Sequence, residues 1–235
     1  MDSIETDLSG RVVSFLSTCI GCAHCGSYCP SNCYDLPGIK HSDSVDTRKL
    51  QDLYENRRSV RSFSEKEIDE SVISSLLEPV GFSPTGRNAQ GITVDVILGY
   101  ESVEKLLFRP LVKLVRVLDS FRLLSLFAGK ARGAVKKIRN GEDIITWKAP
   151  CVLLFRAPRK NVTGSMDAVI AATMVSIKAE AMGLGCFWNG VVQMAAPVLP
   201  ISKPNAVLCI GYPAFKKHQH VPAREWTRRD ISQIV

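Results

Sequence analysis

The sequence predicts an α+β protein in which helices surround a mixed or mostly antiparallel sheet, with a small cysteine-rich segment before it. Helical and strand patterns are interspersed along the chain without a repeated strand-helix-strand period, which disfavours a parallel sheet. Apolar residues make up 46% of the chain and charged residues 23%, a balance typical of globular proteins. Five of the eight cysteines lie between positions 19 and 33, and they define the N-terminal segment.

The length of 235 residues suggests one full domain and a smaller module. No apolar run provides the roughly 18 uncharged residues that a membrane span needs, because charged side chains interrupt the longest run, residues 106–127. The N-terminal sequence MDSIETDLSG is acidic and lacks the apolar core of a signal peptide. We therefore expect a cytoplasmic protein without a membrane span.

The net charge of +7 is compatible with nucleic acid, an acidic membrane face or anionic ligands as partners. The sequence shows no basic helix-turn-helix, zinc-finger or RNP-like aromatic motif, so we do not expect nucleic acid as a partner. A protein that used this charge to bind nucleic acid or membranes would show steeply salt-dependent binding.

Along the larger part of the chain, the first predicted helix covers residues 64–79. A capping-box pattern S-x-x-E opens it at Ser64, apolar residues recur on one face, and Pro79 ends it. A loop with the sequence SPTGRNAQG follows, and the alternating apolar residues at 92–98 predict a strand. An amphipathic helical pattern then covers residues 103–127, and the basic residues 129–142 are loosely patterned.

The second half of the chain predicts a long helix between strands. Residues 151–157 form an apolar run typical of a buried strand. A helix is predicted from Asp167 to Gly183, and its inward residues are expected to be Ile170, Met174, Ile177 and Ala181. Further strands are predicted over residues 186–192 and 206–210.

The clustered cysteines have the spacing C-x2-C-x2-C-x3-C-P of bacterial ferredoxins, with Cys19, Cys22, Cys25 and Cys29 as the four positions. Three thiolates two residues apart can wrap a tight loop around one face of a 4Fe–4S cluster. Zinc is the alternative metal, but a zinc site typically takes a second pair of ligands at a distance. The spacing therefore predicts an iron–sulfur site.

The fourth ligand of this cluster stays open, because in two-cluster ferredoxins the cysteine before proline binds the other cluster. Cys29 or Cys33 could complete the site, a three-iron cluster or none could form, or the natural chain could begin earlier with a first motif. We expect residues 1–40 to form the iron–sulfur module and residues 48–235 the larger domain. The other cysteines lie in apolar runs and are expected to fill the core: Cys151, Cys186 and Cys209.

Several short motifs follow one another through the larger domain. They are NRRSVRSF at 56–63, SPTGRNAQ at 83–90, GEDIITWKAP at 141–150, AMGLGCFWNG at 181–190, and IGYPAF at 210–215 followed by Arg224. In this order they resemble the nitroreductase family of FMN enzymes. Together with the ferredoxin motif, they resemble ferredoxin-type nitroreductases. The resemblance implies a nitroreductase-like FMN-binding fold after a small ferredoxin-like segment.

Arg57, Arg58, Ser59 and Arg61 place three cations and a hydroxyl group within five residues. This set suits a phosphate dianion, which guanidinium groups contact in a bidentate manner. The basic start of a solvated helix is the alternative reading of the same residues. The resemblance implies that this segment binds the phosphate and ribityl chain of FMN, with Arg224 on the same phosphate.

The resemblance also places two other segments against the flavin. In the SPTGRNAQ loop, backbone or amide groups are expected to meet the ring edge or the ribityl chain, at Pro84, Thr85, Gly86, Asn88 and Gln90. After Trp188, a backbone amide is expected to hydrogen-bond flavin N5 and help tune its redox properties, at Asn189, Gly190 or Val191. The chain departs from the family at Gly91, where proline is usual, and at Val191, where a second glycine is usual.

The resemblance implies an oxidoreductase with a ping-pong mechanism, in which the flavin is reduced, the donor leaves and the acceptor enters at the same face. The acceptor would be a nitro compound, a quinone or a similar conjugated molecule. The cluster suggests reduced ferredoxin as the donor, and NAD(P)H becomes the donor if no cluster assembles. The family also implies a homodimer with FMN between the subunits, and no catalytic acid or base, since the chemistry belongs to the cofactor. A non-enzymatic iron–sulfur or flavin electron carrier or redox sensor is the alternative.

Overall fold

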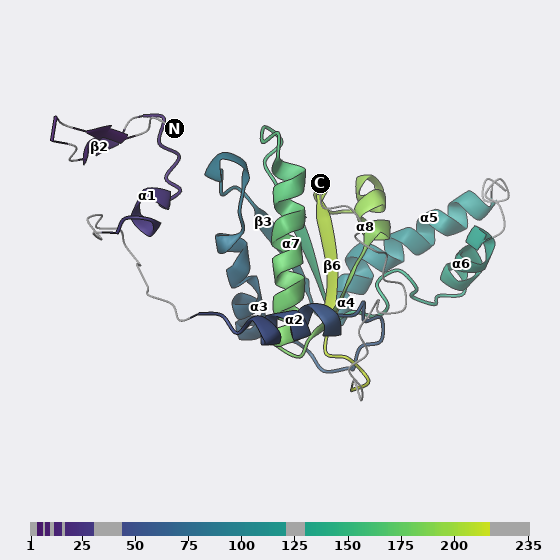
Figure 1. Cartoon of the computed structure of the whole chain (residues 1–235). Helices are drawn as coiled ribbons and strands as arrows, with labels where there is room; N and C mark the ends of the chain where they lie inside the picture. The colour runs from purple at the N-terminus through teal and green to yellow at the C-terminus, as the bar shows by residue number, and fades with distance from the viewer. Residues whose placement is uncertain are drawn as a thin grey trace, which may run out of the picture.

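A four-stranded sheet in the order β3-β4-β6-β5 forms the centre of the fold (Figure 1). The strands are β3 (Thr93–Leu98), β4 (Cys151–Arg156), β5 (Gly185–Trp188) and β6 (Ala206–Gly211). The structure is a computed structural model, and it describes residues 4–6, 8–9, 12–15, 17–30, 44–120 and 130–216. Every neighbouring pair of strands in this sheet is antiparallel, which confirms the α+β class predicted from the sequence.

The two central strands are buried along almost their whole length, which explains their continuous apolar sequences. Strand β4 pairs with β6 from Cys151 opposite Ile210 to Phe155 opposite Ala206. Because side chains alternate between the faces of a strand, Leu153 and Phe155 lie on one face of the sheet and Leu154 lies on the other. The three cysteines expected in the core are all buried: Cys151, Cys186 and Cys209.

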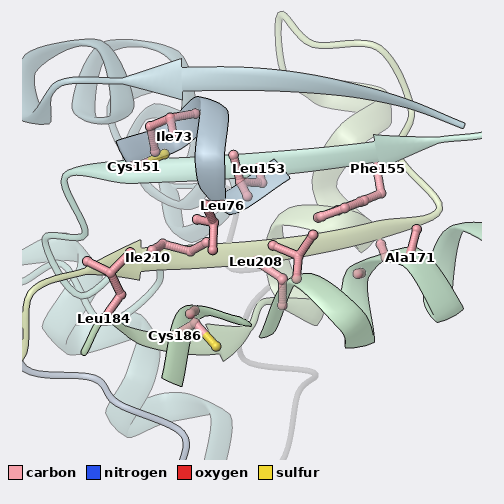
Figure 2. Packing of buried hydrophobic residues seen from close by; sticks show 14 of the residues in the cluster. Ile73, Leu76, Cys151, Leu153, Phe155, Ala171, Leu184, Cys186, Leu208 and Ile210 are labelled. Carbon is pink, nitrogen blue, oxygen red and sulfur yellow. The ribbon is translucent and has the colours of Figure 1, made fainter. Parts of the chain in front are cut away.

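Helices cover both faces of the sheet. On one face, α3 (Glu70–Leu77) and α7 (Gly164–Ala181) pack against the strands. Figure 2 shows Leu76 of α3 and Ala171 of α7 on this face, beside Leu153, Phe155 and Leu208. On the other face, a second buried cluster joins the strands to the helices of residues 100–120 and 190–195. The sheet therefore lies in a core with two apolar faces.

Helix α7 packs on the sheet with a different face from the one predicted. Its buried apolar residues are Ala168, Ala171, Ala172, Val175 and Ala179. Ile170, expected to point inward, is 38% exposed, and Ala181 is exposed as well. Small alanine side chains let the helix approach the strands closely, and apolar residues occur all round it, so periodicity alone does not select the inward face.

The helices before β3 differ from the prediction at their starts. Helix α2 (Thr47–Asn56) begins after Asp46, whose carboxylate caps the backbone N–H groups of Arg48 and Lys49. Helix α3 follows Asp69 and not the predicted capping box at Ser64, because the Ser64 N–H donates to the Tyr212 carbonyl in an extended segment. The chain continues past Pro79 in a short 3-10 helix, η1 (Glu78–Phe82).

After β3 the chain packs on the sheet and then extends away from it along α5 (Arg109–Ser120) and α6 (Lys130–Arg139), which form an arm (Figure 1). The elements before the arm are α4 (Tyr100–Val103) and η3 (Glu104–Phe108). The predicted helix at 103–127 is confirmed as far as residue 120, and the remainder lies outside the described residues. The loosely patterned basic stretch is also helical, over α6.

The predicted strand at 186–192 is correct only in its first half. Strand β5 ends at Trp188, and α8 (Gly190–Ala195) and η5 (Ala196–Val198) follow it. The side chain of Asn189 caps α8 by accepting from the Val192 N–H at 3.0 Å. Because Asn189 caps the next turn, the apolar residues after it form the start of α8 and not a continuation of β5.

The N-terminal residues form a small hairpin and a short helix. They are β1 (Ile4–Thr6), β2 (Val12–Phe15) and α1 (His24–Ser27), and the two strands pair in an antiparallel manner. Among the described residues, no helix is both long and apolar enough to cross a membrane.

Candidate functional site

The basic segment at residues 57–61 lies along the edge strand β5. Ser59 forms a parallel bridge with Cys186, and the Val60 N–H donates to the Cys186 carbonyl at 3.0 Å. A Cβ on Gly185 would lie 2.7 Å from Val60, so the glycine lets this segment approach β5 closely. We call this segment the phosphate segment below, after the ligand expected from its sequence, and its Val60 lines a hollow with Glu180 and Gly183 at the C-terminal end of α7.

The arginines of the phosphate segment have different surroundings. Arg58 Nη1 donates to the carbonyls of Glu55 at 2.5 Å and Arg57 at 3.0 Å, so part of its guanidinium group caps the end of α2. The Arg61 guanidinium lies 5.3 Å from the centre of the Phe187 ring and is exposed. Ser59 is exposed too.

Arg57 carries a buried hydrogen-bond donor that has no acceptor among the described residues. Its Nη1 atom is buried, and no hydrogen-bond partner for it occurs among the residues that the structure describes. A buried donor on a charged group costs free energy when it is left unpaired. An anionic group beside Arg57 would accept a hydrogen bond from this donor. The segment therefore suits the phosphate that its sequence predicts as a ligand.

The SPTGRNAQ loop at residues 83–90 is a tight turn with an unusual backbone. Ser83 is buried and donates its hydroxyl to the Val80 carbonyl at 2.8 Å. The 3-10 turn η2 (Gly86–Asn88) follows, and Arg87, Asn88 and Gln90 adopt positive φ angles. Strained backbone of this kind is common where a loop must present its groups to a ligand.

The loop is fastened to the start of α7 by Asp167. The Gly86 N–H donates to Asp167 Oδ1 at 3.2 Å, and Asn161 Nδ2 and Thr163 Oγ1 donate to Oδ2 at 2.9 and 3.0 Å. Burial raises the pKa of the Asp167 carboxyl, but these hydrogen bonds outweigh it and hold the pKa below its ordinary value. Asp167 is therefore an ionised clamp between the loop and the helix.

Side chains on the loop bond to each other and to the cysteine-rich segment. The Gln90 N–H donates to Thr85 Oγ1, and Gln90 Nε2 donates to Asn88 Oδ1, each at 3.0 Å. Asn88 Nδ2 donates to the Ile20 carbonyl at 3.0 Å, and Ile20 lies between Cys19 and Cys22. The structure thus brings the cysteine motif into contact with the loop expected to meet the flavin.

At the junction of β5 and α8, the buried side chain of Asn189 holds neighbouring segments together by hydrogen bonds. It is 3% exposed, and its Nδ2 donates to the Ile145 carbonyl at 2.8 Å and to Cys209 Sγ at 3.2 Å. Its backbone N–H donates to the Val207 carbonyl at 2.9 Å. The next two residues, Gly190 and Val191, are exposed in the first turn of α8, where backbone N–H groups have no acceptor within the helix.

The phosphate segment and the SPTGRNAQ loop lie at opposite ends of α7. The loop bonds to Asp167 near the start of the helix, whereas Val60 lines a hollow with Glu180 and Gly183 at its end. At a rise of about 1.5 Å per residue, these two points are about 20 Å apart along the helix axis. One chain therefore does not bring the two segments together.

The cysteines do not form a metal site in the part of the chain that the structure describes. Cys19 and Cys22 are exposed, and Cys25 and Cys29 are half-buried. No group of three or more histidine, cysteine, aspartate or glutamate side chains there is arranged to hold a metal ion. The described residues thus do not show the 4Fe–4S site predicted from the sequence, and Cys33 and Arg224 lie outside them.

Sequence reasoning missed Asp167 as a site residue and assigned it only to the start of a helix. Its partner Gly86 lies 81 residues away in the sequence, so no local pattern joins them. A usable signal was the run of polar residues Asn161, Thr163 and Asp167 around a helix start, which is typical of a clamped N-terminus.

The chain was compared with known proteins. The sequence profile of the nitroreductase family matches residues 54–212. A search of curated proteins found no match. Similar solved structures include an FMN-dependent nitroreductase from Clostridium difficile R20291, with a TM-score of 0.58, 16% identity, and coverage of 80% of this chain and 100% of that one.

Two further structures share the fold. A nitroreductase with bound FMN from Desulfitobacterium hafniense DCB-2 has a TM-score of 0.55 and 16% identity, over 77% of this chain and 95% of that one. An FMN-dependent nitroreductase from Mycobacterium smegmatis, in complex with NADPH, has a TM-score of 0.53 and 18% identity, over 72% of this chain and 89% of that one.

Proposed function

Because this chain belongs to the nitroreductase family, we propose that it is an FMN-dependent oxidoreductase that reduces nitro compounds, quinones or similar conjugated acceptors. The observation that carries the proposal is the buried Nη1 of Arg57, which has no partner among the described residues and lies in the motif NRRSVRSF. The similar structures that contain FMN support the same cofactor here.

We assign different residues of the site to different parts of FMN. We assign the phosphate to Arg57 and Ser59, with Arg224 on the same group, and Arg58 also steadies the end of α2. Arg61, which lies exposed beside the Phe187 ring, is assigned to the same phosphate and ribityl chain. We assign the backbone N–H groups of Gly190 and Val191 to flavin N5, with the junction held by Asn189; a bound flavin would supply the redox chemistry.

We propose that the enzyme is a homodimer whose two chains share each FMN. The ribityl chain and phosphate are joined directly, yet the segments assigned to them lie at opposite ends of α7 in one chain. Large apolar side chains are exposed on this helix: Met166, Val169 and Ile170. A second chain packed antiparallel on this face would bury them and bring its SPTGRNAQ loop, from Pro84 to Gln90, to the phosphate segment.

The electron donor is assigned to NAD(P)H, since a similar enzyme has been solved with NADPH. The cysteine spacing supports a second candidate, reduced ferredoxin acting through a 4Fe–4S cluster on Cys19, Cys22, Cys25 and Cys29. The described residues do not gather these thiols, so no step of the reaction is derived through a cluster.

Flavin binding tests the proposal. The full chain is titrated with FMN, and Arg57→Ala is compared with Arg48→Ala, which removes an exposed arginine from α2. We expect wild type and Arg48→Ala to bind FMN and to reduce nitro or quinone acceptors, and Arg57→Ala to bind at least tenfold more weakly, or about 1.4 kcal/mol. Failure of the wild-type chain to bind FMN would overturn the assignment.

Metal analysis distinguishes the donors. FMN, iron and sulfide are measured per chain after purification without oxygen. About four iron atoms per chain would support the ferredoxin route. FMN without iron would support NAD(P)H alone, and iron without FMN would favour the electron carrier over the enzyme.

A further inference from the structure

A polar cavity of about 600 Å³ lies where β4 ends, α7 begins and the chain enters β6. None of the segments that line it belongs to the phosphate segment or to the SPTGRNAQ loop. The polar side chains in its lining include Arg156, Arg159, Ser165, Ser202, Lys203 and Asn205.

The charged side chains in the lining of this cavity are basic, and one of them, Arg156, pairs with the neighbouring carboxylate of Asp95. Arg156, Arg159 and Lys203 line it, and none of the described residues in its lining is acidic. Arg159 and Lys203 are exposed, so both can move toward a ligand. Because Asp95 offsets the charge of Arg156, the positive charge of the lining comes mainly from Arg159 and Lys203, and it favours an anion over a cation.

Arg156 has a buried hydrogen-bond donor without a partner among the described residues. Its Nη2 donates to Asp95 Oδ1 at 2.6 Å, which fixes the guanidinium group at the cavity. Its Nε atom is buried, and the structure holds no hydrogen-bond partner for it among the described residues. The Asp95 carboxylate holds one end of the guanidinium group, and the Arg156 side chain remains 34% exposed at the cavity, where a charged oxygen can contact it.

Neutral donors complete the lining. Asn205 accepts from the Ala157 N–H at 3.0 Å, and its Nδ2 donates to Ser165 Oγ at 3.0 Å. Because Ser165 accepts this bond, its hydroxyl hydrogen can be donated into the cavity. The exposed hydroxyl of Ser202 lies in the same lining. Hydroxyl groups between cations are typical of sites that bind tetrahedral oxyanions.

We propose that this cavity binds a phosphoryl group. A phosphate dianion offers several acceptor oxygens and two negative charges, which match three cations and the hydroxyl donors together. The site is separate from the proposed FMN phosphate site within one chain, because Val60 of the phosphate segment lies beside Glu180 and Gly183 at the other end of α7. The phosphoryl group comes from free phosphate or from the phosphates of a dinucleotide donor, and the second source rests on the proposed function.

Binding of inorganic phosphate to the FMN-loaded protein tests the site without turnover. Titration calorimetry and thermal melting are run in phosphate and in sodium chloride of equal ionic strength. Wild type is compared with Arg159→Ala/Lys203→Ala and with Lys105→Ala/Lys160→Ala, a control with equal loss of charge at exposed positions outside the cavity lining. Absorbance of bound flavin and circular dichroism verify that each variant is folded.

We expect wild type and the control to bind phosphate, with a melting temperature that rises with phosphate concentration by mass action. The cavity variant should bind at least tenfold more weakly. Equal stabilisation by phosphate and chloride in the wild type would overturn the proposal, because it shows general screening only. Equal phosphate binding by the cavity variant would overturn it too, because the phosphate then lies elsewhere.

Steady-state kinetics then separate the two sources. If a dinucleotide supplies the phosphoryl group, the cavity variant raises the KM for NADPH or NADH at least tenfold and leaves kcat near its wild-type value. If free phosphate is the ligand, these KM values stay unchanged while phosphate binding is lost. Either pattern supports the site, whereas a chain that binds phosphate normally but fails to turn over contradicts only the proposed function.

Discussion

The SPTGRNAQ loop is held by a contact that leaves no room for a side chain at position 86. A Cβ on Gly86 would lie 2.2 Å from Thr163 Oγ1 and 2.9 Å from Thr163 Cβ. The Thr163 hydroxyl lies 2.9 Å from Asn161 Oδ1 and 3.0 Å from Asp167 Oδ2 and can donate its one hydrogen to either, so it cannot rotate away without losing this bond. Gly86→Ala must therefore displace the loop or break the clamp.

The expected cost follows from these two routes. Overpacking a tight contact costs about 1–3 kcal/mol. Moving the loop outward instead breaks the bond from the Gly86 N–H to the Asp167 carboxylate, and a hydrogen bond to a charged group contributes about 1.5–3 kcal/mol. Because the chain takes the cheaper of these two routes, we expect Gly86→Ala to lower the free energy of unfolding by about 1–3 kcal/mol.

Urea unfolding of the full chain measures this loss. Gly81→Ala is the matched control, since a Cβ there meets nothing within 4 Å. A double variant, Gly86→Ala/Thr163→Gly, removes the atoms that clash, so it should be more stable than the sum of the single changes by about 1 kcal/mol or more. Flavin titration of the same variants asks whether the loop also serves FMN.

The reasoning is refuted if Gly86→Ala and Gly81→Ala unfold with free energies that differ by less than about 0.5 kcal/mol. It is also refuted if the double variant shows no favourable coupling between positions 86 and 163. A loss of stability with unchanged FMN affinity would support the clamp between the loop and α7. It would also show that the loop does not contribute to the proposed flavin site.

Three other predictions test the clamp, the junction and the dimer. Hydrogen bonds lower the pKa of Asp167, so its carboxylate stabilises the fold at neutral pH, and this contribution is lost as pH falls below about 4. Asp167→Asn should flatten that acid loss in urea unfolding, and an unchanged acid loss would contradict it. Asn189→Ala leaves buried backbone groups unpaired, so we expect a loss of about 2–4 kcal/mol, against almost none for Asn140→Ala. Ile170→Lys should yield a monomer in analytical ultracentrifugation, whereas Val117→Lys should not; a dimeric Ile170→Lys would place the interface elsewhere.

The buried strands were the most predictable part of the fold. The apolar runs of β4 and β6 have no helical period that competes with the strand assignment, and both are confirmed. Helix α7 was predictable in extent but not in orientation, because its alanines and its larger apolar residues form two different faces. A sequence pattern records that a residue is apolar, but not whether the sheet or another chain covers it.

The site shows the same division between local and distant information. The phosphate segment was recognisable because its arginines and serine are adjacent, and the structure adds that Arg57 has an unsatisfied buried donor. The roles of Asn189 and Asp167 depend on partners such as Cys209 and Gly86, which are distant in sequence. The identity of a ligand-binding residue can be local, but the support that orients it comes from tertiary contacts.

Helix α7 contributes to the core, to the proposed flavin site and to the proposed dimer contact. Its buried face supports the sheet, its two ends hold the two segments assigned to the flavin, and its outer face exposes Met166, Val169 and Ile170. If a second chain covers that outer face, the contact that buries the apolar residues also completes the flavin site. Binding of FMN and association of the chains are then linked by mass action, because a flavin held by both chains stabilises only the dimer. The exposed apolar face and the divided site are thus two consequences of one arrangement along α7.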